Sequence, residues 1–270
     1  MKTMRQSIVI AVLLVSTLLM QNNTLADAEP TPVAIITGSS YGLGKELTQR
    51  AVANGWRVAL VDIRPGPSLD TVEAIRKAGG EAVFFEVDLA QPSQRAGLAS
   101  KVLDSFGRID YLFNNAGYAY LATLEQMTQA DAKRLFEVNY WAYADLAQQV
   151  IPVMRAQGGG TILNVSSILG MRAAGAGFGH YSASKHALHG LFQAVMAEVA
   201  DANIKVLIAA PGGMRTHVGK HSVGPLVAPG SDRAANWEDP AIAANDIFAR
   251  LAGESGIFNP GAVGRRMQSQ

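Results

Sequence analysis

The stretch VAIITGSSYGLGKEL, residues 33–47, joins an apolar run to a glycine-rich turn and then to a helical pattern. The run VAIIT predicts a buried strand. Glycine lets backbone N–H groups approach a phosphate, and a helix N-terminus adds partial positive charge. The stretch therefore predicts a strand–turn–helix unit suited to phosphate, whose three turn glycines are Gly38, Gly42 and Gly44. Their spacing differs from the G-x-G-x-x-G pattern of many dinucleotide folds.

The rest of the chain repeats this alternation. Short apolar runs predict strands at 33–37, 57–62, 82–88, 109–117, 160–167 and 204–212. Longer amphipathic runs predict helices at 44–55, 69–80, 92–107 and 130–157. Strands that are apolar on both faces and alternate with helices predict a parallel sheet covered on both sides. We therefore expect a doubly wound α/β domain that binds ligands beyond the carboxyl ends of its strands.

The composition is that of a globular protein. The chain has 270 residues, 49% of them hydrophobic and 17% charged, with a formal net charge of +1. This balance gives no field that would favour nucleic acid. The absence of cysteine excludes disulfides and thiolate zinc sites. Because no repeat or linker divides the chain, we expect one domain over residues 29–270.

The first 28 residues form a separate pattern. Two positive charges in MKTMRQ precede an uncharged apolar run from Ser7 to Met20, and TLADA offers small residues for cleavage after Ala26 or Ala28. This order is typical of a secretory signal, and the run is shorter than the ~20 residues that span a bilayer. We expect a signal peptide or N-terminal anchor at 1–28, in an exported or membrane-associated protein that contacts membrane only if the segment is retained. The alternative is a cytoplasmic protein translated from Met20.

The second predicted strand ends at Asp62. A carboxylate at this place can hydrogen-bond the adenosine ribose of NAD and would repel the extra phosphate of NADP. Position 41 holds Tyr41 rather than a basic residue, which also favours NAD. Arg64 is the opposing feature, and we interpret it as a solvated loop charge. The sequence therefore predicts NAD in preference to NADP.

Several spaced motifs resemble those of the short-chain dehydrogenase/reductase family. In chain order they are T37-G38-x-x-x-G42-x-G44, Asp88, N114-N115-A116-G117, Asn139, Ser167, Tyr181-x-x-x-Lys185 and P211-G212. The resemblance runs from about Val33 to Thr216. It implies a seven-stranded Rossmann sheet in three α/β/α layers that binds NAD(H) or NADP(H). It also implies an oxidoreductase acting on the CH–OH group of a secondary alcohol, or on the corresponding ketone.

Tyr181 and Lys185 lie four residues apart in a helical run, so their side chains share one face. A free tyrosine has a pKa of about 10, and lowering it to about 7 requires roughly 4 kcal/mol of preference for the phenolate. A cation about 4 Å away supplies on the order of 4 kcal/mol at an intermediate dielectric. The pair therefore suits acid/base chemistry, although the same spacing also occurs by chance on surface helices.

The family resemblance assigns a role to each of these groups. Ser167 would hydrogen-bond the substrate oxygen and Tyr181 would exchange its proton. Lys185 would hold the cofactor ribose and lower the tyrosine pKa, while Asn139 would order a water relay. Ser166 competes with Ser167, and we prefer Ser167 because the family usually uses the second serine of such a pair.

The resemblance also places the cofactor. Ile63 and Asp88 would flank the adenine, and Asn115 and Gly117 would shape the ribose site. Pro211, Gly212 and Thr216 would frame the nicotinamide carboxamide, although Ile63 also fits an ordinary apolar position and Thr216 a helix cap. The full expected cofactor set is Gly38, Ser40, Tyr41, Gly42, Leu43, Gly44, Asp62, Ile63, Asp88, Leu89, Asn115, Ala116, Gly117, Tyr181, Lys185, Pro211, Gly212 and Thr216.

The histidines and the loops complete the expected site. His186 and His189 share a helix face, but no nearby carboxylate completes a ligand set, so we expect no metal. The segment 213–237 predicts a substrate lid. Together with 168–180 it would line a pocket of small and apolar groups for the alcohol or ketone.

Two questions of assembly and activity remain open in the sequence. The chain ends in SGIFNPGAVGRRMQSQ, without the glycine pair that often closes the last strand in the family, which weighs against a standard tetramer. Helices over Tyr140–Met154 and Ser184–Ala200 would still form a dimer, so we expect a homodimer or homotetramer. The competing function is a non-catalytic dinucleotide-binding sensor or scaffold. The Asn/Ser/Tyr/Lys set favours the enzyme, because a binding module needs no proton-transfer groups.

Overall fold

The computed structural model describes residues 30–172, 174–215, 222–227, 237–262 and 265–266. The expected signal segment, Thr216 and much of the predicted lid lie outside these residues. Among the helices that are described, none is long and apolar enough to cross a membrane.

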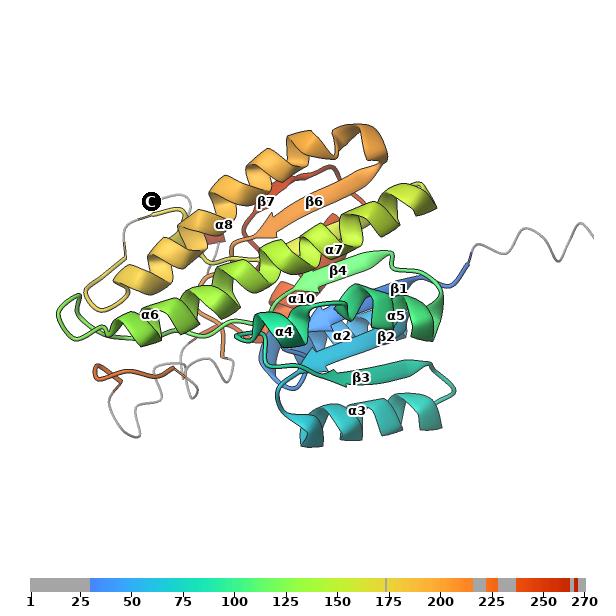
Figure 1. Ribbon diagram of the computed structural model, residues 1–270, viewed down its shortest axis with the longest axis horizontal. Helices are drawn as coiled ribbons and strands as arrows, with labels where there is room; N and C mark the ends of the chain where they lie inside the picture. Colours follow the sequence, from blue (N-terminus) through green and yellow to red (C-terminus); the bar gives the residue numbers. More distant parts are fainter. Residues whose placement is uncertain (1–29, 173, 216–221, 228–236, 263–264, 267–270) are drawn as a thin grey trace, which may run out of the picture. The chain divides into compact units, whose positions relative to one another are not determined.

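A seven-stranded parallel sheet runs through the described chain (Figure 1). Its spatial order is β3-β2-β1-β4-β5-β6-β7, which confirms the expected doubly wound Rossmann sheet. Because β1 pairs with β2 on one side and β4 on the other, the winding reverses between β1 and β4. Ligands of such sheets bind in the crevice at that point. The strands are β1 Val33–Thr37, β2 Arg57–Asp62, β3 Ala82–Glu86, β4 Tyr111–Asn114, β5 Gly160–Val165, β6 Ile204–Ala209 and β7 Gly256–Phe258.

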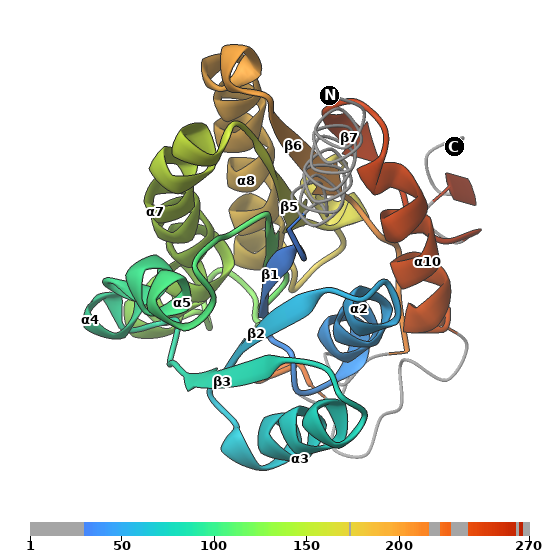
Figure 2. The ribbon, with the colours of Figure 1, turned by 90° about the vertical axis from the view of Figure 1, so that its right-hand side faces the viewer.

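Helices cover both faces of the sheet (Figure 2). On one face pack α2 Gly42–Ala53, α3 Pro65–Lys77 and α10 Pro240–Leu251. The other face carries α5 Leu98–Phe106, α7 Ala142–Gln157 and α8 Gly179–Glu198. The shorter helices α4 Pro92–Arg95 and α6 Gln129–Phe136 precede α5 and α7.

The strand β1 explains why the sequence signal for this sheet is a continuous apolar run. All five of its residues are buried. Ile35 packs into the core under α5, α7 and α8, whereas Ile36 packs into the core under α2, α3 and α10. Successive side chains of a strand point to opposite faces, so a sheet covered on both sides needs apolar residues at every position.

Two predicted helices differ from the observed ones. The run 92–107 divides into α4 and α5, because Gly97 takes a φ of +71° that a continuous helix does not allow. The run 130–157 contains a π-helical turn, Glu137–Trp141, between α6 and α7. Such turns often occur at functional sites. Predicted strands also end early: β3, β4 and β5 stop at Glu86, Asn114 and Val165.

Paired amides join the central strands at their carboxyl ends. Asn114 of β4 and Asn164 of β5 are register partners, and both are fully buried. The Asn114 Nδ2 donates to Asn164 Oδ1 at 3.0 Å and to the Tyr143 carbonyl at 3.3 Å. The Asn164 Nδ2 donates to the Leu207 carbonyl at 3.4 Å. These bonds connect β4, β5, β6 and α7.

A buried arginine joins the loop after β3 to the π-helical turn. The Arg95 side chain is 3% exposed. Its guanidinium donates to the Leu89 carbonyl at 2.5 Å, to Glu137 Oε2 at 2.8 Å and to Asp145 Oδ2 at 2.7 Å. The Gln149 side chain donates to the Arg95 carbonyl at 3.1 Å. Arg95 therefore holds together segments that the sequence analysis treated separately.

We expect Arg95→Met to lower the free energy of unfolding by about 3 kcal/mol, because removing one partner leaves the carboxylates and the Leu89 carbonyl without their donor. Urea denaturation measures this change. Arg155→Met is the matched control: Arg155 pairs with Asp201 at an exposed site, and such pairs contribute about 0–1 kcal/mol. Equal losses in the two variants would show that Arg95 acts as a surface charge.

Candidate active site

The turn between β1 and α2 lies directly against the end of β4. Gly38 has a φ of +67°, and a Cβ on it would lie 2.9 Å from Ala116 Cα. A Cβ on Gly44 would lie 2.1 Å from the Gly38 carbonyl oxygen. Neither approach tolerates a side chain, so these glycines allow close backbone packing as well as an open phosphate site.

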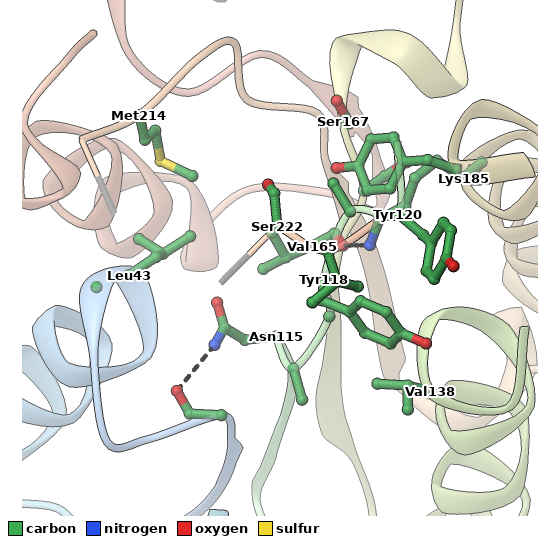
Figure 3. Close-up of a pocket in the computed structure, with 18 of the residues that line it drawn as sticks. Leu43, Asn115, Tyr118, Tyr120, Val138, Val165, Ser167, Lys185, Met214 and Ser222 are labelled. Atoms are coloured by element: carbon green, nitrogen blue, oxygen red, sulfur yellow. Dashed lines mark hydrogen bonds between the residues drawn. The ribbon is translucent and has the colours of Figure 1, made fainter. Parts of the chain in front are cut away.

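Thr37 and Asn115 fix this close approach. Thr37 Oγ1 accepts the backbone N–H of Asn115 at 2.9 Å and of Ala116 at 3.0 Å. The Asn115 side-chain amide donates back to the Thr37 carbonyl at 2.8 Å and to the Gly38 carbonyl at 3.4 Å, and the bond to Gly38 is the one drawn near Asn115 in Figure 3. The asparagine expected to shape the ribose site thus anchors the glycine turn to β4.

Asp62 lies at the far end of the turn and is 7% exposed. Its Oδ2 accepts the Ser40 N–H at 3.1 Å and its Oδ1 accepts the Arg64 N–H at 3.0 Å. The Arg64 guanidinium lies 3.9 Å from Asp62 Oδ1 and stacks over Tyr41, 5.8 Å from the ring centroid. Arg64 is therefore part of the wall around Asp62, and its interpretation as a solvated loop charge is incomplete.

Asp88 follows β3 and faces the same crevice. Its carboxylate accepts the Ala90 N–H at 2.9 Å and pairs with Arg134 at 3.2 Å. Leu89 contributes its carbonyl to the buried Arg95. Two arginines thus hold the loop that is expected to flank adenine. Arg95 binds the Leu89 carbonyl, and Arg134 binds the Asp88 carboxylate.

Asn139 lies within the π-helical turn and is fully buried. Its Oδ1 accepts the Tyr118 N–H at 3.1 Å, and its Nδ2 donates to the Tyr118 carbonyl at 3.0 Å. The Nδ2 also donates to Ser184 Oγ at 3.3 Å. The side-chain amide therefore fixes the segment after Gly117 against α8.

The two candidate serines have different surroundings. Ser167 hydrogen-bonds Tyr181 and also accepts the Leu169 N–H at 3.1 Å. Ser166 also lines the cavity, but its Oγ lies 2.8 Å from His189 Nε2. Of the two, Ser167 is the serine that meets the tyrosine, as the sequence analysis preferred.

Lys185 is 3% exposed and reaches the base of the same site. Its Nζ donates to the Val165 carbonyl at 2.9 Å, the second bond drawn in Figure 3. The ammonium also lies over the Tyr143 ring, 5.2 Å from the centroid. A Cβ on Gly117 would lie 3.5 Å from Nζ. The NNAG motif and the Tyr-x-x-x-Lys motif therefore meet at this point.

Burial dominates the electrostatics of the pair. Desolvation raises the pKa of Tyr181, and the hydrogen bond with Ser167 acts in the opposite direction. Desolvation also lowers the pKa of Lys185 to about 7. The lowered tyrosine pKa that the sequence predicts is thus opposed by desolvation, which disfavours the charged form of both groups.

A cavity of about 1060 Å³ extends from the glycine turn to Tyr181. This volume is at the upper end of the ~300–1,000 Å³ typical of ligand sites. Of the expected residues, Ser40, Gly44 and Asn139 support the wall from behind, and Thr216 lies outside the described residues. The expected residues on the wall are Gly38, Tyr41, Gly42, Leu43, Asp62, Ile63, Asp88, Leu89, Asn115, Ala116, Gly117, Ser167, Tyr181, Lys185, Pro211 and Gly212.

The wall also contains residues that sequence reasoning missed. Tyr118, Phe178 and Trp237 all line the cavity. Tyr118 follows the NNAG motif directly, which was a usable signal, whereas Trp237 lies far from any motif. In the described part of the chain, no group of three metal-ligating side chains comes together.

Comparison with known proteins identifies the fold family. The short chain dehydrogenase family model matches residues 32–224. The chain belongs to the short-chain dehydrogenase/reductase family. It is therefore an oxidoreductase of the NAD(P)-binding kind. Bovine dehydrogenase/reductase SDR family member 7B is 32% identical over 81% of this chain and 70% of its own length.

Solved structures of the family superpose on most of the chain. A short-chain dehydrogenase from Streptomyces avermitilis is 31% identical with a TM-score of 0.79, covering 90% of this chain and 92% of its own. A metagenomic short-chain oxidoreductase in complex with NADP is 29% identical with a TM-score of 0.71, covering 87% and 100%.

The residues of this family member fit a nicotinamide dinucleotide. Gly38 and Gly117 leave backbone exposed along the cavity, the N-terminus of α2 points partial positive charge toward it, and Asp62 stands at one end. A Cβ on Gly117 would lie 3.2 Å from Asn139 Oδ1, so a side chain here would press against that amide.

We expect the free energy of unfolding to rise with pH between about 7 and 10 in the ligand-free protein. The unfolded chain keeps Lys185 protonated in this range while the folded protein does not, so folding is favoured as protons are removed. The rise is up to about 4 kcal/mol over 3 pH units. Lys185→Met should lack it, whereas the exposed Lys101→Met should retain it, as measured by urea denaturation at several pH values. Parallel curves for all three proteins would contradict the buried ammonium.

Proposed function

We propose that the protein interconverts a secondary alcohol and a ketone, with a nicotinamide dinucleotide as hydride partner and Tyr181 as general acid/base. The observation that carries this proposal is the meeting of Ser167, Tyr181 and Lys185 at one end of the cavity that begins at the glycine turn. A tyrosine that exchanges a proton needs a hydrogen-bond partner and, in its ionised form, a nearby cation. Ser167 is the hydrogen-bond partner of Tyr181, and Lys185 is the cation.

Each residue of the cluster has a distinct task. A bound NAD(P) would supply or accept hydride. Ser167 would donate a hydrogen bond to the substrate oxygen, and Tyr181 would take the hydroxyl proton during oxidation and return it during reduction. Lys185 would hold the cofactor ribose and favour the phenolate by its charge. Asn139 would act by position, because its amide fixes the backbone of Tyr118 beside Gly117.

The cofactor is proposed to be NAD rather than NADP. Asp62 is buried and points its carboxylate at the end of the cavity, where a ribose phosphate would meet a negative charge. Arg64 opposes this effect in part, because its guanidinium lies beside the same carboxylate. The relative crystallised with NADP shows that the family accommodates that cofactor too.

The alternative of a non-catalytic dinucleotide-binding module is less favoured. Such a module would need the glycine turn, Asp62 and the ribose contact of Lys185, yet it would gain nothing from a proton-exchanging tyrosine that hydrogen-bonds Ser167 and costs free energy to desolvate.

We further propose that the protein forms the homodimer or homotetramer expected from the sequence. We also propose that residues 1–28 direct export or membrane association, and the alternative is a cytoplasmic protein.

We expect Tyr181→Phe to reduce turnover of a secondary alcohol by about 10²–10⁴-fold, the usual contribution of a general acid/base. Dinucleotide binding should stay nearly unchanged, because the ring and its packing are retained. Absorbance of the reduced cofactor measures turnover, and calorimetric titration measures binding.

The matched control is Tyr111→Phe, which removes a hydroxyl from β4 outside the described cavity wall. It should keep wild-type turnover. Lys185→Ala should lose both turnover and cofactor affinity. Wild-type turnover in Tyr181→Phe would refute the assigned mechanism, and a loss of affinity equal to that of Lys185→Ala would refute the division of roles.

We expect the wild-type protein to bind NAD more tightly than NADP, because Asp62 repels the additional phosphate. Asp62→Asn removes the charge and should shift the ratio of the two dissociation constants toward NADP by about 10-fold, equivalent to ~1.4 kcal/mol. Arg64→Gln should shift the ratio the other way. Tighter binding of NADP by the wild-type protein would overturn this preference.

A further inference from the structure

The described part of the predicted lid includes a strap, defined as residues 222–227, that is tied to the loop after β4. Leu121 donates its N–H to the Val223 carbonyl at 2.8 Å, and Val223 donates to the Ala119 carbonyl at 3.0 Å. Gly224, with a φ of +109°, leaves so little space that a Cβ would lie 2.8 Å from the Tyr120 ring. The strap therefore forms one side of the cavity, contributes Ser222, Val223 and Val227 to its wall, and is hydrogen-bonded to the loop after β4.

The strap is also joined to the loop that precedes Tyr181. Ala122 donates its N–H to the Gly177 carbonyl at 3.1 Å, and a Cβ on Gly177 would lie 2.8 Å from Leu226 Cδ1. The next residue, Phe178, meets Tyr181 edge to face with ring centroids 6.4 Å apart. The strap and Phe178 thus enclose the space beside the Tyr181 hydroxyl.

Trp237 forms a separate wall that depends on a glycine. The indole lies flat against Gly213: a Cβ there would lie 2.8 Å from Cδ2, 2.9 Å from Cε2 and 3.0 Å from Cγ. Backbone bonds hold the two segments side by side, since Glu238 donates to the Gly213 carbonyl at 3.1 Å. Gly213 follows Pro211 and Gly212, and the Pro211 carbonyl accepts the Ile168 N–H at 3.0 Å. The indole therefore lies close to the segment that bears Ser167.

The charged side chains on this part of the wall are paired with other wall groups. Asp131 accepts the Tyr120 hydroxyl at 2.9 Å and the Thr128 hydroxyl at 2.6 Å. Arg134 pairs with Asp88. Lys185 also lies on this wall, where its Nζ donates to the Val165 carbonyl, and it is assigned to the cofactor ribose. Among the described residues beyond Gly117, the rest of the wall facing Tyr181 is apolar or aromatic or offers hydroxyl groups. An ionised substrate group would lose its water here, and each charged side chain of this wall already has a partner or a role with the cofactor.

Resting on the proposed function, we propose that the substrate is an uncharged, ring-bearing secondary alcohol or ketone, and that Trp237, seated on Gly213, determines which ring sizes are accepted. The flat faces of Trp237, Phe178 and Tyr118 offer more contact to a ring than to a flexible chain. A ring also loses less conformational freedom on binding. Trp237 is thus a specificity-determining residue for the proposed reaction.

The substrate class is tested by comparing kcat/KM for cyclohexanol, 2-decalol, 2-butanol and 3-hydroxybutyrate with NAD and with NADP. We expect the better ring alcohol to exceed 2-butanol by roughly 10-fold or more and 3-hydroxybutyrate to be the poorest. The last two compounds share a four-carbon chain and differ in the carboxylate. Equal or better use of 2-butanol or 3-hydroxybutyrate would overturn the substrate class.

The role of Trp237 is tested by the ratio of kcat/KM for 2-decalol to that for cyclohexanol. Trp237→Ala should raise this ratio by roughly 10–100-fold. The substitution opens space for the bicyclic ring of 2-decalol and removes a contact with the single ring of cyclohexanol. Gly213→Ala should change the ratio in the wild-type protein but not in Trp237→Ala, because it acts through the indole. Gly190→Ala, where a Cβ meets nothing within 4 Å, is the matched control and should leave the ratio unchanged. An unchanged ratio in Trp237→Ala would overturn the assignment.

A failure of the proposed function would look different. It would appear as no turnover of any alcohol above that of Tyr181→Phe. Calorimetric titration of cyclohexanone and 2-decalone into cofactor-saturated Tyr181→Phe then decides the inference without turnover. Binding of these ketones, with relative affinities that Trp237→Ala changes, supports it, and absence of binding overturns it.

Discussion

The closeness of Gly38 to Ala116 is the constraint from which the site follows. The strands β1 and β4 are neighbours whose connections leave in opposite directions, so their carboxyl ends can approach only if no side chain intervenes. Thr37 and Asn115 close this junction with hydrogen bonds. The glycine turn, the Asp62 carboxylate and the N-terminus of α2 take their positions from it. Gly117, at the end of the NNAG motif, lies against the Asn139 amide and beside the Lys185 ammonium.

The fold could be predicted because its signals are local. A strand buried on both faces is apolar at every position, and six such runs alternating with helical patterns leave few other arrangements. The interruptions of the predicted helices 92–107 and 130–157 were harder to predict. The positive φ of Gly97 interrupts one predicted helix, and the π-helical turn at Glu137–Trp141 interrupts another. The buried Arg95 bonds Leu89, which precedes the first of these helices, and Glu137 and Asp145, which belong to the second. No pattern within one segment reports such a contact.

The site divides in the same way. Spacing places Tyr181 above Lys185 on one helix, and motif order brings Asp62 and the glycines to the same edge. The spacing does not report the environment of the pair: desolvation raises the pKa of the tyrosine and lowers that of the lysine. Trp237 was missed because its place depends on the absence of a side chain at Gly213. The position of Tyr181 and Lys185 therefore lowers the free energy of unfolding, and this cost serves the site rather than the fold.

The amide pair Asn114–Asn164 has a consequence for how the chain finds its strand register. In a sheet that is apolar on both faces, a register shift of one residue replaces one apolar face of the strand by the other. The hydrophobic pattern therefore disfavours such a shift only weakly. The two amides penalise it strongly. They bond each other only when Asn114 stands opposite Asn164, and a shift would take the Asn164 Oδ1 acceptor away from the Asn114 Nδ2 donor at about 1–3 kcal/mol per buried group left unpaired. Two polar residues thus fix the register of β4 against β5, whose apolar residues would pack almost as well if the strands were shifted by one residue.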